Sequence, residues 1–184
     1  VMMKDSAVAS YANAENGEVR FGEGSLRFDF DYSELKDGYK NVNCWVFITG
    51  DSYRSNPESS HAIKFDGTPS GLGCWVYAPE GTPNFWLWTK ISYYNEDGVL
   101  KSANIHFKTQ AGRNLQYTGI YWDGWMYCEA DLTPYAKYVT PEHPLMIADG
   151  DYFINVTFIP GGSANENGTK IPMGDFAKGT LYFD

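Results

Sequence analysis

The chain alternates between hydrophobic and polar residues over several short runs, and turn-forming residues separate these runs. In the clearest run, 25–32, Leu26, Phe28 and Phe30 alternate with polar neighbours. A period of two places successive side chains on opposite faces of a β-strand, so this run predicts a half-buried antiparallel strand. The full set of predicted strands is 7–11, 25–32, 43–49, 62–65, 72–77, 85–91, 100–108, 115–117, 125–132, 152–159 and 179–184.

Short strands at even spacing, with few runs of helical period, predict an all-β fold. The segments 33–41, 50–60 and 161–168 are expected to be loops, and 134–144 a loop with at most one helical turn. The 184 residues fit one domain, 1–184, that buries a full core. The predicted architecture is a two-sheet antiparallel β-sandwich.

The stretch 71–92 carries the most distinctive pattern. Two aromatic-rich runs flank a Pro- and Gly-containing turn at 79–84, which predicts a hairpin. Its mostly aliphatic positions suit the interior of a sandwich. The aromatic set then points outward, where an antiparallel sheet usually presents polar residues. This outward set consists of Trp75, Tyr77, Trp86 and Trp88.

Four large rings on a face that should be polar are typical of a platform for a sugar chain. The axial C–H face of a sugar packs on an aromatic ring and removes apolar area from water. Lys90 and His106, the latter on the expected neighbouring strand, are candidates to hydrogen-bond sugar hydroxyls. The alternative interpretation is that the rings pack beneath a loop or against a neighbouring domain.

Composition narrows the class of ligand. The formal net charge of −9 disfavours nucleic acid, anionic membranes and polyanionic glycans, and it suits a neutral ligand. No apolar run approaches the roughly 20 residues of a membrane span. The chain starts at Val1 without a recognisable signal peptide, which predicts a fragment of a longer, processed protein.

The three cysteines fall at inward positions of predicted strands. Cys44, Cys74 and Cys128 are therefore predicted to be buried free thiols, and their spacing is too wide for a zinc site.

Four segments resemble a family of β-jelly-roll, carbohydrate-binding-type modules found beside phosphodiester glycosidases and other bacterial polysaccharide-active enzymes. The segments are GSLRFDFDY (24–32), DGTPSGLGCWVYAPEGTPNFWLWTKI (66–91), IYWDGWMYCEADL (120–132) and GTLYFD (179–184). The resemblance implies a galactose-binding-like jelly roll without a catalytic role. It implies a secreted bacterial protein, extracellular or at the cell surface, in which a monomeric module is linked to a catalytic domain. It also implies that 72–77 and 85–91 belong to one sheet with a concave outer face.

The same resemblance implies one structural calcium ion. Asp184 matches the family's terminal metal-binding aspartate, and Glu23 lies in the turn before the strand that usually faces it. The alternative is a solvated chain end.

The leading hypothesis is a non-catalytic module that binds a neutral, β-linked plant polysaccharide such as xylan, mannan or β-glucan, and that targets an attached enzyme to it. The alternatives are a structural or adhesive domain with a protein partner, and a jelly-roll lyase or glycosidase. Glu129 and Asp131 superficially match the Glu-x-Asp-x-Glu strand of jelly-roll glucanases, but Thr133 occupies the third position. Trp122 and Trp125 are interpreted as structural, whereas ligand contact by Trp45, Tyr121 or Trp122 stays open.

Overall fold

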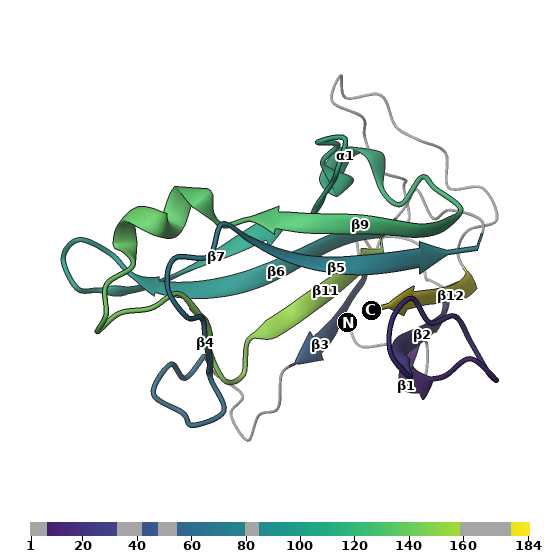
Figure 1. The fold of residues 1–184 in the computed structure, drawn as a ribbon, viewed down its shortest axis with the longest axis horizontal. Coiled ribbons are helices and arrows are strands. Elements are labelled where there is room, and N and C mark those ends of the chain that lie inside the picture. The colour runs from purple at the N-terminus through teal and green to yellow at the C-terminus, as the bar shows by residue number, and fades with distance from the viewer. Residues whose placement is uncertain (1–6, 33–41, 48–54, 80–84, 159–177) are drawn as a thin grey trace.

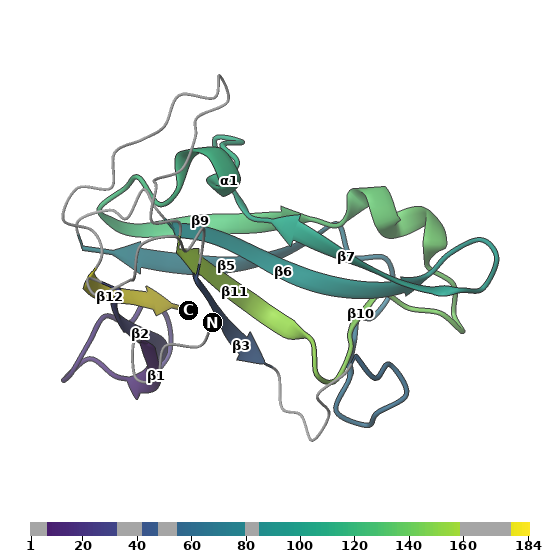
Figure 2. The ribbon, with the colours of Figure 1, turned by 180° about the vertical axis from the view of Figure 1, so that it is seen from behind.

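The protein folds into two antiparallel sheets that pack against each other (Figure 1). The structure, a computed structural model, describes residues 7–32, 42–47, 55–79, 85–158 and 178–184, with 42–47 and 158 described by their backbone alone. Figure 1 looks onto β5 and β9 of one sheet, and Figure 2, from behind, looks onto β6 and β7 of the other. The prediction of a two-sheet antiparallel sandwich is confirmed.

The first sheet, sheet A, contains both the earliest and the last described strands. Its order is β1-β2-β12-β5-β9-β8. The bounds are β1 (Ala7–Ala12), β2 (Ser25–Asp31), β12 (Lys178–Phe183), β5 (Gly71–Ala78), β9 (Gly124–Asp131) and β8 (Lys108–Thr109).

The second sheet, sheet B, has the order β3-β11-β6-β10-β4, and a further strand, β7, pairs with β6. The bounds are β3 (Val42–Phe47), β11 (Tyr152–Phe158), β6 (Phe85–Tyr94), β10 (Met146–Ile147), β4 (Ile63–Lys64) and β7 (Leu100–His106). The chain passes between the sheets several times, most directly from β5 to β6 and from β7 to β8.

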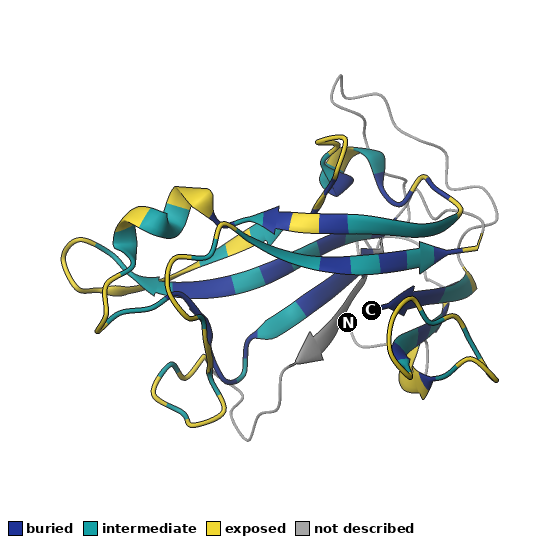
Figure 3. Cartoon of the chain, viewed as in Figure 1, coloured by how far each residue is buried: buried dark blue, intermediate teal, exposed yellow. Residues whose placement is uncertain are grey.

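The core lies between the sheets and uses the inward positions that the alternation predicts. Figure 3 shows buried and partly exposed residues alternating along the central strands. Phe28 and Phe30 of β2 are buried as expected, while Asp31 is exposed. The main cluster draws on both sheets and includes Cys74, Val76, Phe85, Leu87, Cys128, Ala130, Ile154, Val156, Leu181 and Phe183.

Two strand predictions are wrong. Residues 115–117 belong to a short helix, α1 (Leu115–Thr118), because the Asn114 side chain accepts the Gln116 N–H as an N-cap and Gly119, with φ 61°, ends the turn. The predicted strand 100–108 is divided at the buried Phe107, where the chain leaves β7 of sheet B for β8 of sheet A. The helical turn expected within 134–144 is the 3-10 helix η1 (Thr133–Tyr138).

The cysteine prediction is confirmed for two of the three cysteines. Cys74 and Cys128 are buried free thiols, whereas the Cys44 side chain lies outside the described ones. Burial raises the pKa of the Cys74 thiol to about 12 and raises the pKa of Cys128 as well. Among the described residues, no helix has the length and apolar character that crossing a membrane requires.

Candidate functional site

The predicted aromatic platform is divided between two opposite faces of the molecule. The expected hairpin 71–92 is wrong, because β5 lies in sheet A and β6 lies in sheet B. Alternation correctly gave the inward side of each strand. The inward side chains of β5 and β6 meet in the core between the two sheets. The outward side chains of the two strands therefore lie on opposite outer faces of the sandwich. The implication that 72–77 and 85–91 share one sheet is therefore also wrong.

On sheet B, the outward side chains Trp86, Trp88, Lys90, His106 and Tyr152 form what we call the Trp88 face. It brings together four of the six predicted ligand-binding residues. Register explains the grouping, because β6 places Trp88 opposite His106 of β7 on one side and Asn155 of β11 on the other. The Trp88 and His106 rings are stacked, with centroids 5.8 Å apart and planes at 18°.

The rings of the Trp88 face are fixed by polar groups as well as by packing. Trp88 Nε1 donates to Thr157 Oγ1 at 2.7 Å, and that hydroxyl donates to Asn155 Oδ1 at 3.0 Å. The Tyr152 ring meets Trp88 edge-on at 5.3 Å. Trp88 therefore has a neighbour on each side and a fixed orientation.

Tyr152 and His106 both present neutral groups to this face. Burial raises the pKa of Tyr152 to about 12, and its hydroxyl donates to Asn104 Oδ1 at 2.8 Å. Burial lowers the pKa of His106, which keeps the imidazole uncharged at neutral pH. The buried Nδ1 of His106 has no hydrogen-bond partner among the described residues. Tyr152 was missed in the sequence, because strict alternation puts it on the same side as the buried Ile154 and Val156, whereas an irregularity between Tyr152 and Ile154 brings its ring to the outer face.

Lys90 is engaged differently from the prediction. Its Nζ lies 2.6 Å from Asp151 Oδ1, and the side chain of Asp151 is only 3% exposed. Ser55 Oγ also donates to the Asp151 carboxylate, at 2.6 Å. The ammonium carries three donors, so the ion pair leaves donor capacity on Nζ. Its first role in this structure is nevertheless to neutralise a buried carboxylate.

On sheet A, the outward side chains Trp75, Tyr77, Trp125, Tyr127 and Tyr182 form what we call the Trp75 face. Register places Trp75 opposite Tyr127 and Tyr77 opposite Trp125. The ring centroids are 5.7 Å apart in the first pair and 5.3 Å in the second. Trp125 was interpreted as structural, but it stands partly exposed beside Tyr77. Only the pairing of β5 with β9 reveals this cluster.

The segment between β1 and β2, residues 13–24, covers part of the Trp75 face, and we call it the cover segment. The Arg20 guanidinium lies 4.6 Å from the Trp75 ring centroid, and the Phe21 ring lies 5.9 Å from it. A Cβ added at Gly17 would lie 2.6 Å from the Tyr182 ring, so the backbone there packs directly on that ring. These contacts match the alternative in which rings pack beneath a loop.

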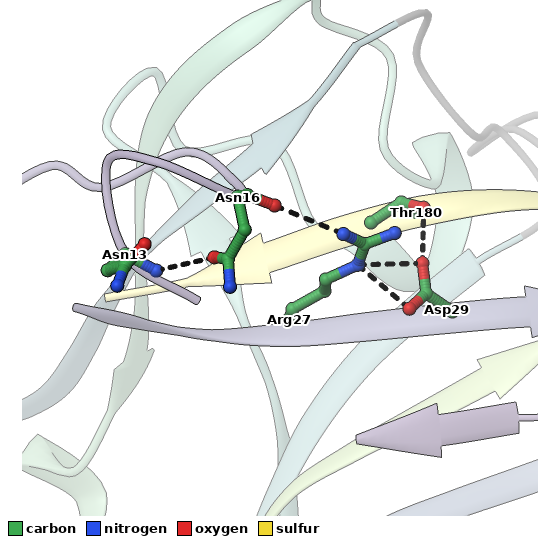
Figure 4. Close-up of polar contacts among 5 residues, drawn as sticks. All are labelled: Asn13, Asn16, Arg27, Asp29 and Thr180. Carbon is green, nitrogen blue, oxygen red and sulfur yellow. Dashed lines mark hydrogen bonds and ion pairs between the residues drawn. The ribbon is translucent and has the colours of Figure 1, made fainter. Parts of the chain in front are cut away.

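Polar contacts anchor the cover segment at two points, at Asn16 and at Arg20–Phe21. Arg27 Nη1 donates to the Asn16 carbonyl at 3.1 Å while its Nε is bound to Asp29, which also accepts from Thr180 (Figure 4). At the second point, Asp184 Oδ2 accepts hydrogen bonds from the backbone N–H groups of Arg20 and Phe21 at 2.8 and 2.9 Å.

Of the two predicted metal ligands, Asp184 is engaged by other groups in this structure. The Asp184 carboxylate oxygen faces two N–H donors, which attract an anion rather than a cation. The Glu23 side chain is exposed, and its carbonyl accepts from the Tyr11 hydroxyl at 2.9 Å. Within the described ranges, no group of three or more His, Cys, Asp or Glu side chains is arranged to hold a metal ion.

The remaining candidates are structural or peripheral. Trp122 is 7% exposed, and its Nε1 donates to the Val76 carbonyl at 3.1 Å, so it is a core residue. Tyr121 is 40% exposed beneath the Arg113 guanidinium, 5.1 Å from its ring centroid. The Trp45 side chain lies outside the described ones, although the register pairs Trp45 with Asn155.

Of the two outward carboxylates of β9, Asp131 is unsuited to act as the general acid of a glycosidase. Glu129 and Asp131 line a cavity of about 470 Å³ at the edge of sheet A. Hydrogen bonds from Thr133 lower the pKa of Asp131. A glycosidase requires a carboxylic acid whose pKa is raised. Asp131 is thus tuned away from general-acid catalysis.

No protein-family model matches this sequence, and no curated protein matches it either. The chain is similar to a solved structure described as "Structural basis for the promiscuous specificity of the carbohydrate-binding modules from the beta-sandwich super family". The two chains are 13% identical and the TM-score is 0.39. The match covers 97% of this chain and 52% of the other, so this chain spans about half the length of that structure. Similarity at this level does not assign a function.

Proposed function

We propose that this protein is a non-catalytic carbohydrate-binding module whose Trp88 face contacts the sugar chain. One observation carries the proposal: Trp86 and Trp88 point outward from the same strand, on a sheet face that would ordinarily be polar. Burying the C–H face of a sugar on such rings contributes about 25 cal/mol per Å² of apolar area.

Neutral hydrogen-bonding groups beside the rings support a sugar rather than a purely apolar ligand. The Asn104 side chain is exposed next to the Tyr152 hydroxyl, and the uncharged His106 imidazole lies against Trp88. Sugar hydroxyls both donate and accept, so amide, phenol and imidazole groups suit them. The positive charge of Lys90 is already matched by Asp151, which disfavours an anionic glycan.

The ligand we propose is the interior of a neutral, β-linked plant polysaccharide such as xylan, mannan or β-glucan. Trp86 and Trp88 leave the same face about 6.6–6.8 Å apart along the strand, from a rise of about 3.3–3.4 Å per residue. An extended β-linked chain has sugar units of comparable length, so the two rings suit adjacent or diagonal units. A row of rings favours the middle of a chain over a single terminal sugar.

Further parts of the proposal concern the whole protein. We propose that residues 1–184 form a single monomeric module in a secreted bacterial protein, and that the module holds an attached catalytic domain on its polysaccharide. A structural calcium ion near Asp184 and Glu23 also belongs to the proposal. It requires Asp184 to offer the ion an oxygen that the Arg20 and Phe21 N–H groups do not occupy.

Affinity electrophoresis tests the proposed function directly. The protein should migrate more slowly in native gels that contain xylan, mannan or a mixed-linkage β-glucan, and normally in a gel that contains polygalacturonate. The same polysaccharides should release no reducing ends on incubation with the protein. Normal migration in all three neutral gels, or retardation by polygalacturonate alone, would contradict the proposal.

One observation favours the second candidate, a domain that contacts another protein. Val8, Tyr11 and Phe21 are 54%, 65% and 57% exposed, and they lie on the edge strand β1 and the cover segment. Exposed apolar residues near a sheet edge suit a protein neighbour. The combined Val8→Ser and Phe21→Ser variant should keep polysaccharide retardation if the two surfaces are independent.

A further inference from the structure

Two of the three cysteines are direct neighbours across a pair of strands. In the antiparallel pairing of β5 with β9, Cys74 lies opposite Cys128. Both side chains point into the core, where they are 6% and 0% exposed. Residues directly opposite each other on one face of a sheet have Cβ atoms about 4.5–5.5 Å apart. The two thiols therefore face the same small volume.

The backbone hydrogen bonds show which kind of antiparallel pair this is. Trp75 exchanges its N–H and C=O with Asp184, on the side of β5 away from β9. Successive residues of a strand direct these groups to alternate sides, so Cys74 directs its own groups toward β9. The Cys74–Cys128 pair is then hydrogen-bonded, with a Cα separation of about 5.5 Å. Disulfides are found at Cα separations of about 4.4–6.8 Å and Cβ separations of about 3.5–4.5 Å, so closing the bond draws the two Cβ atoms together by about 1 Å.

The third cysteine lies apart from this pair in the fold. Cys44 lies in the other sheet, where the register pairs it with Val156 of β11. The three cysteines therefore comprise one cross-strand pair, Cys74 and Cys128, and one separate cysteine, Cys44. The sequence alone does not show which two are paired.

We propose that Cys74 and Cys128 form a disulfide that joins β5 to β9 when the chain folds in the presence of a disulfide oxidant. One cysteine thiolate displaces a thiolate from the oxidant and forms a mixed disulfide. The second thiolate attacks the protein sulfur of that mixed disulfide and releases the other oxidant thiolate. Two S–H bonds are lost, one protein S–S bond forms, and one small disulfide is reduced to two thiols.

Burial determines when this reaction takes place. Removal from water disfavours the thiolate, and the pKa of Cys74 is accordingly raised to about 12. The thiolate is the reactive form, so the folded, reduced protein reacts slowly. During folding both sulfurs are accessible, and closure of the β5–β9 pairing brings them together. The same burial then protects the bond from external reductants.

The bond has a structural consequence for the outer face. The next register pair along the two strands is Trp75 with Tyr127, whose rings pack against each other at an interplanar angle of 58° on the outer side of sheet A. A covalent link one residue away fixes the strand spacing beneath those rings. The inference is independent of the proposed sugar binding, since it depends only on the β5–β9 register.

The test uses a Cys44→Ser chain, which removes the unpaired thiol. The chain is unfolded in reductant and refolded either with a mixture of reduced and oxidised glutathione or with reductant alone. Thiols are then counted by N-ethylmaleimide labelling in denaturant, and intact mass is recorded. The oxidised sample should label at neither cysteine, weigh two hydrogens less, and yield a peptide that joins Cys74 to Cys128.

Matched variants and stability complete the test. Cys74→Ser and Cys128→Ser in the same background should each keep one labelled thiol. The oxidised parent should melt about 5–10 °C above the reduced parent. Two labelled thiols in the oxidised sample, or glutathione attached to each cysteine, would overturn the proposal. A lower melting temperature of the disulfide form would also do so, because the native register would then not accommodate the bond.

Discussion

The outer faces of the two sheets both carry large aromatic rings, yet their surroundings differ. On the Trp75 face the rings contact one another and the cover segment, as Trp75 does with Tyr127 and Phe21. On the Trp88 face the rings contact polar groups, as Trp88 does with Thr157 and His106. Aromatic content alone therefore does not identify a binding face. The cover segment packs on the Trp75 ring, whereas the Trp88 ring has a hydroxyl and an imidazole beside it.

The two faces also differ in how they hold charge. On the Trp88 face, Lys90 pairs with an Asp151 side chain that is 3% exposed. On the Trp75 side, Arg27 pairs with Asp29, and these side chains are 35% and 39% exposed. The first pair neutralises a carboxylate that water cannot reach, whereas water solvates the second.

The largest expected effect tests this contrast in charge. Lys90→Met keeps the aliphatic stem but leaves the buried Asp151 carboxylate without its cation, which should cost about 3–5 kcal/mol of unfolding free energy. Arg27→Met is the matched control and should cost at most about 1 kcal/mol. Urea denaturation of both variants measures the difference. Equal losses would show that the two pairs are equivalent.

Removing a ring from the covered face should have the next largest effect. Trp75→Ala loses its contacts with Arg20, Phe21 and Tyr127, and should cost about 1–2 kcal/mol, because the ring is only partly buried. Retardation in a polysaccharide gel should not change. Loss of retardation by a stable Trp75→Ala protein would instead make the Trp75 face a binding surface.

The anchor of the cover segment gives a smaller effect. Asp184→Ala removes the acceptor of two backbone N–H groups and should cost about 1 kcal/mol, with faster proteolysis within 13–24. If Asp184 holds calcium, a chelator should lower the melting temperature of the native protein but not of Asp184→Ala, and sugar binding should persist. A chelator without effect on the native protein would exclude a structural calcium ion.

The smallest expected effect is a pH dependence on the Trp88 face. The pKa of His106 is lowered by burial, so the unfolded chain takes up a proton more readily. The stability that the neutral imidazole contributes is complete above about pH 6.5 and is lost as the pH falls through the folded-state pKa. His106→Gln should flatten the thermal stability profile below pH 6.5. An unchanged profile would show that other groups cause the slope.

Much of the fold follows from the sequence, because alternation records burial directly. The inward positions of β2, β5, β6 and β9 were predictable, because shifting a strand's register by one residue would expose all of its hydrophobic side chains to solvent. The short helix α1 was missed because its main sequence signal is the N-cap Asn114. A single capping residue is a weaker signal than the apolar residues beside it, which suggested a strand.

The candidate site could be predicted only in part. Periodicity shows which side of a strand faces the core but not which sheet the strand joins, so Trp75 and Trp88 were wrongly placed on one face. Trp125 and Tyr152 join their clusters through pairings with strands distant in the sequence. The engagement of Lys90 with Asp151 likewise depends on contact across 61 positions.

The most direct test of the account compares the same residue type on the two faces. Trp88→Ala and Trp125→Ala each remove a partly exposed tryptophan, one from each sheet. With folding confirmed by circular dichroism, Trp88→Ala should lose at least about 2 kcal/mol of binding. That is about a thirtyfold loss of affinity and should nearly abolish retardation in the polysaccharide gel. Trp125→Ala should migrate as slowly as the native protein. Normal retardation of folded Trp88→Ala, or loss of retardation in Trp125→Ala alone, would contradict the assignment of binding to the Trp88 face.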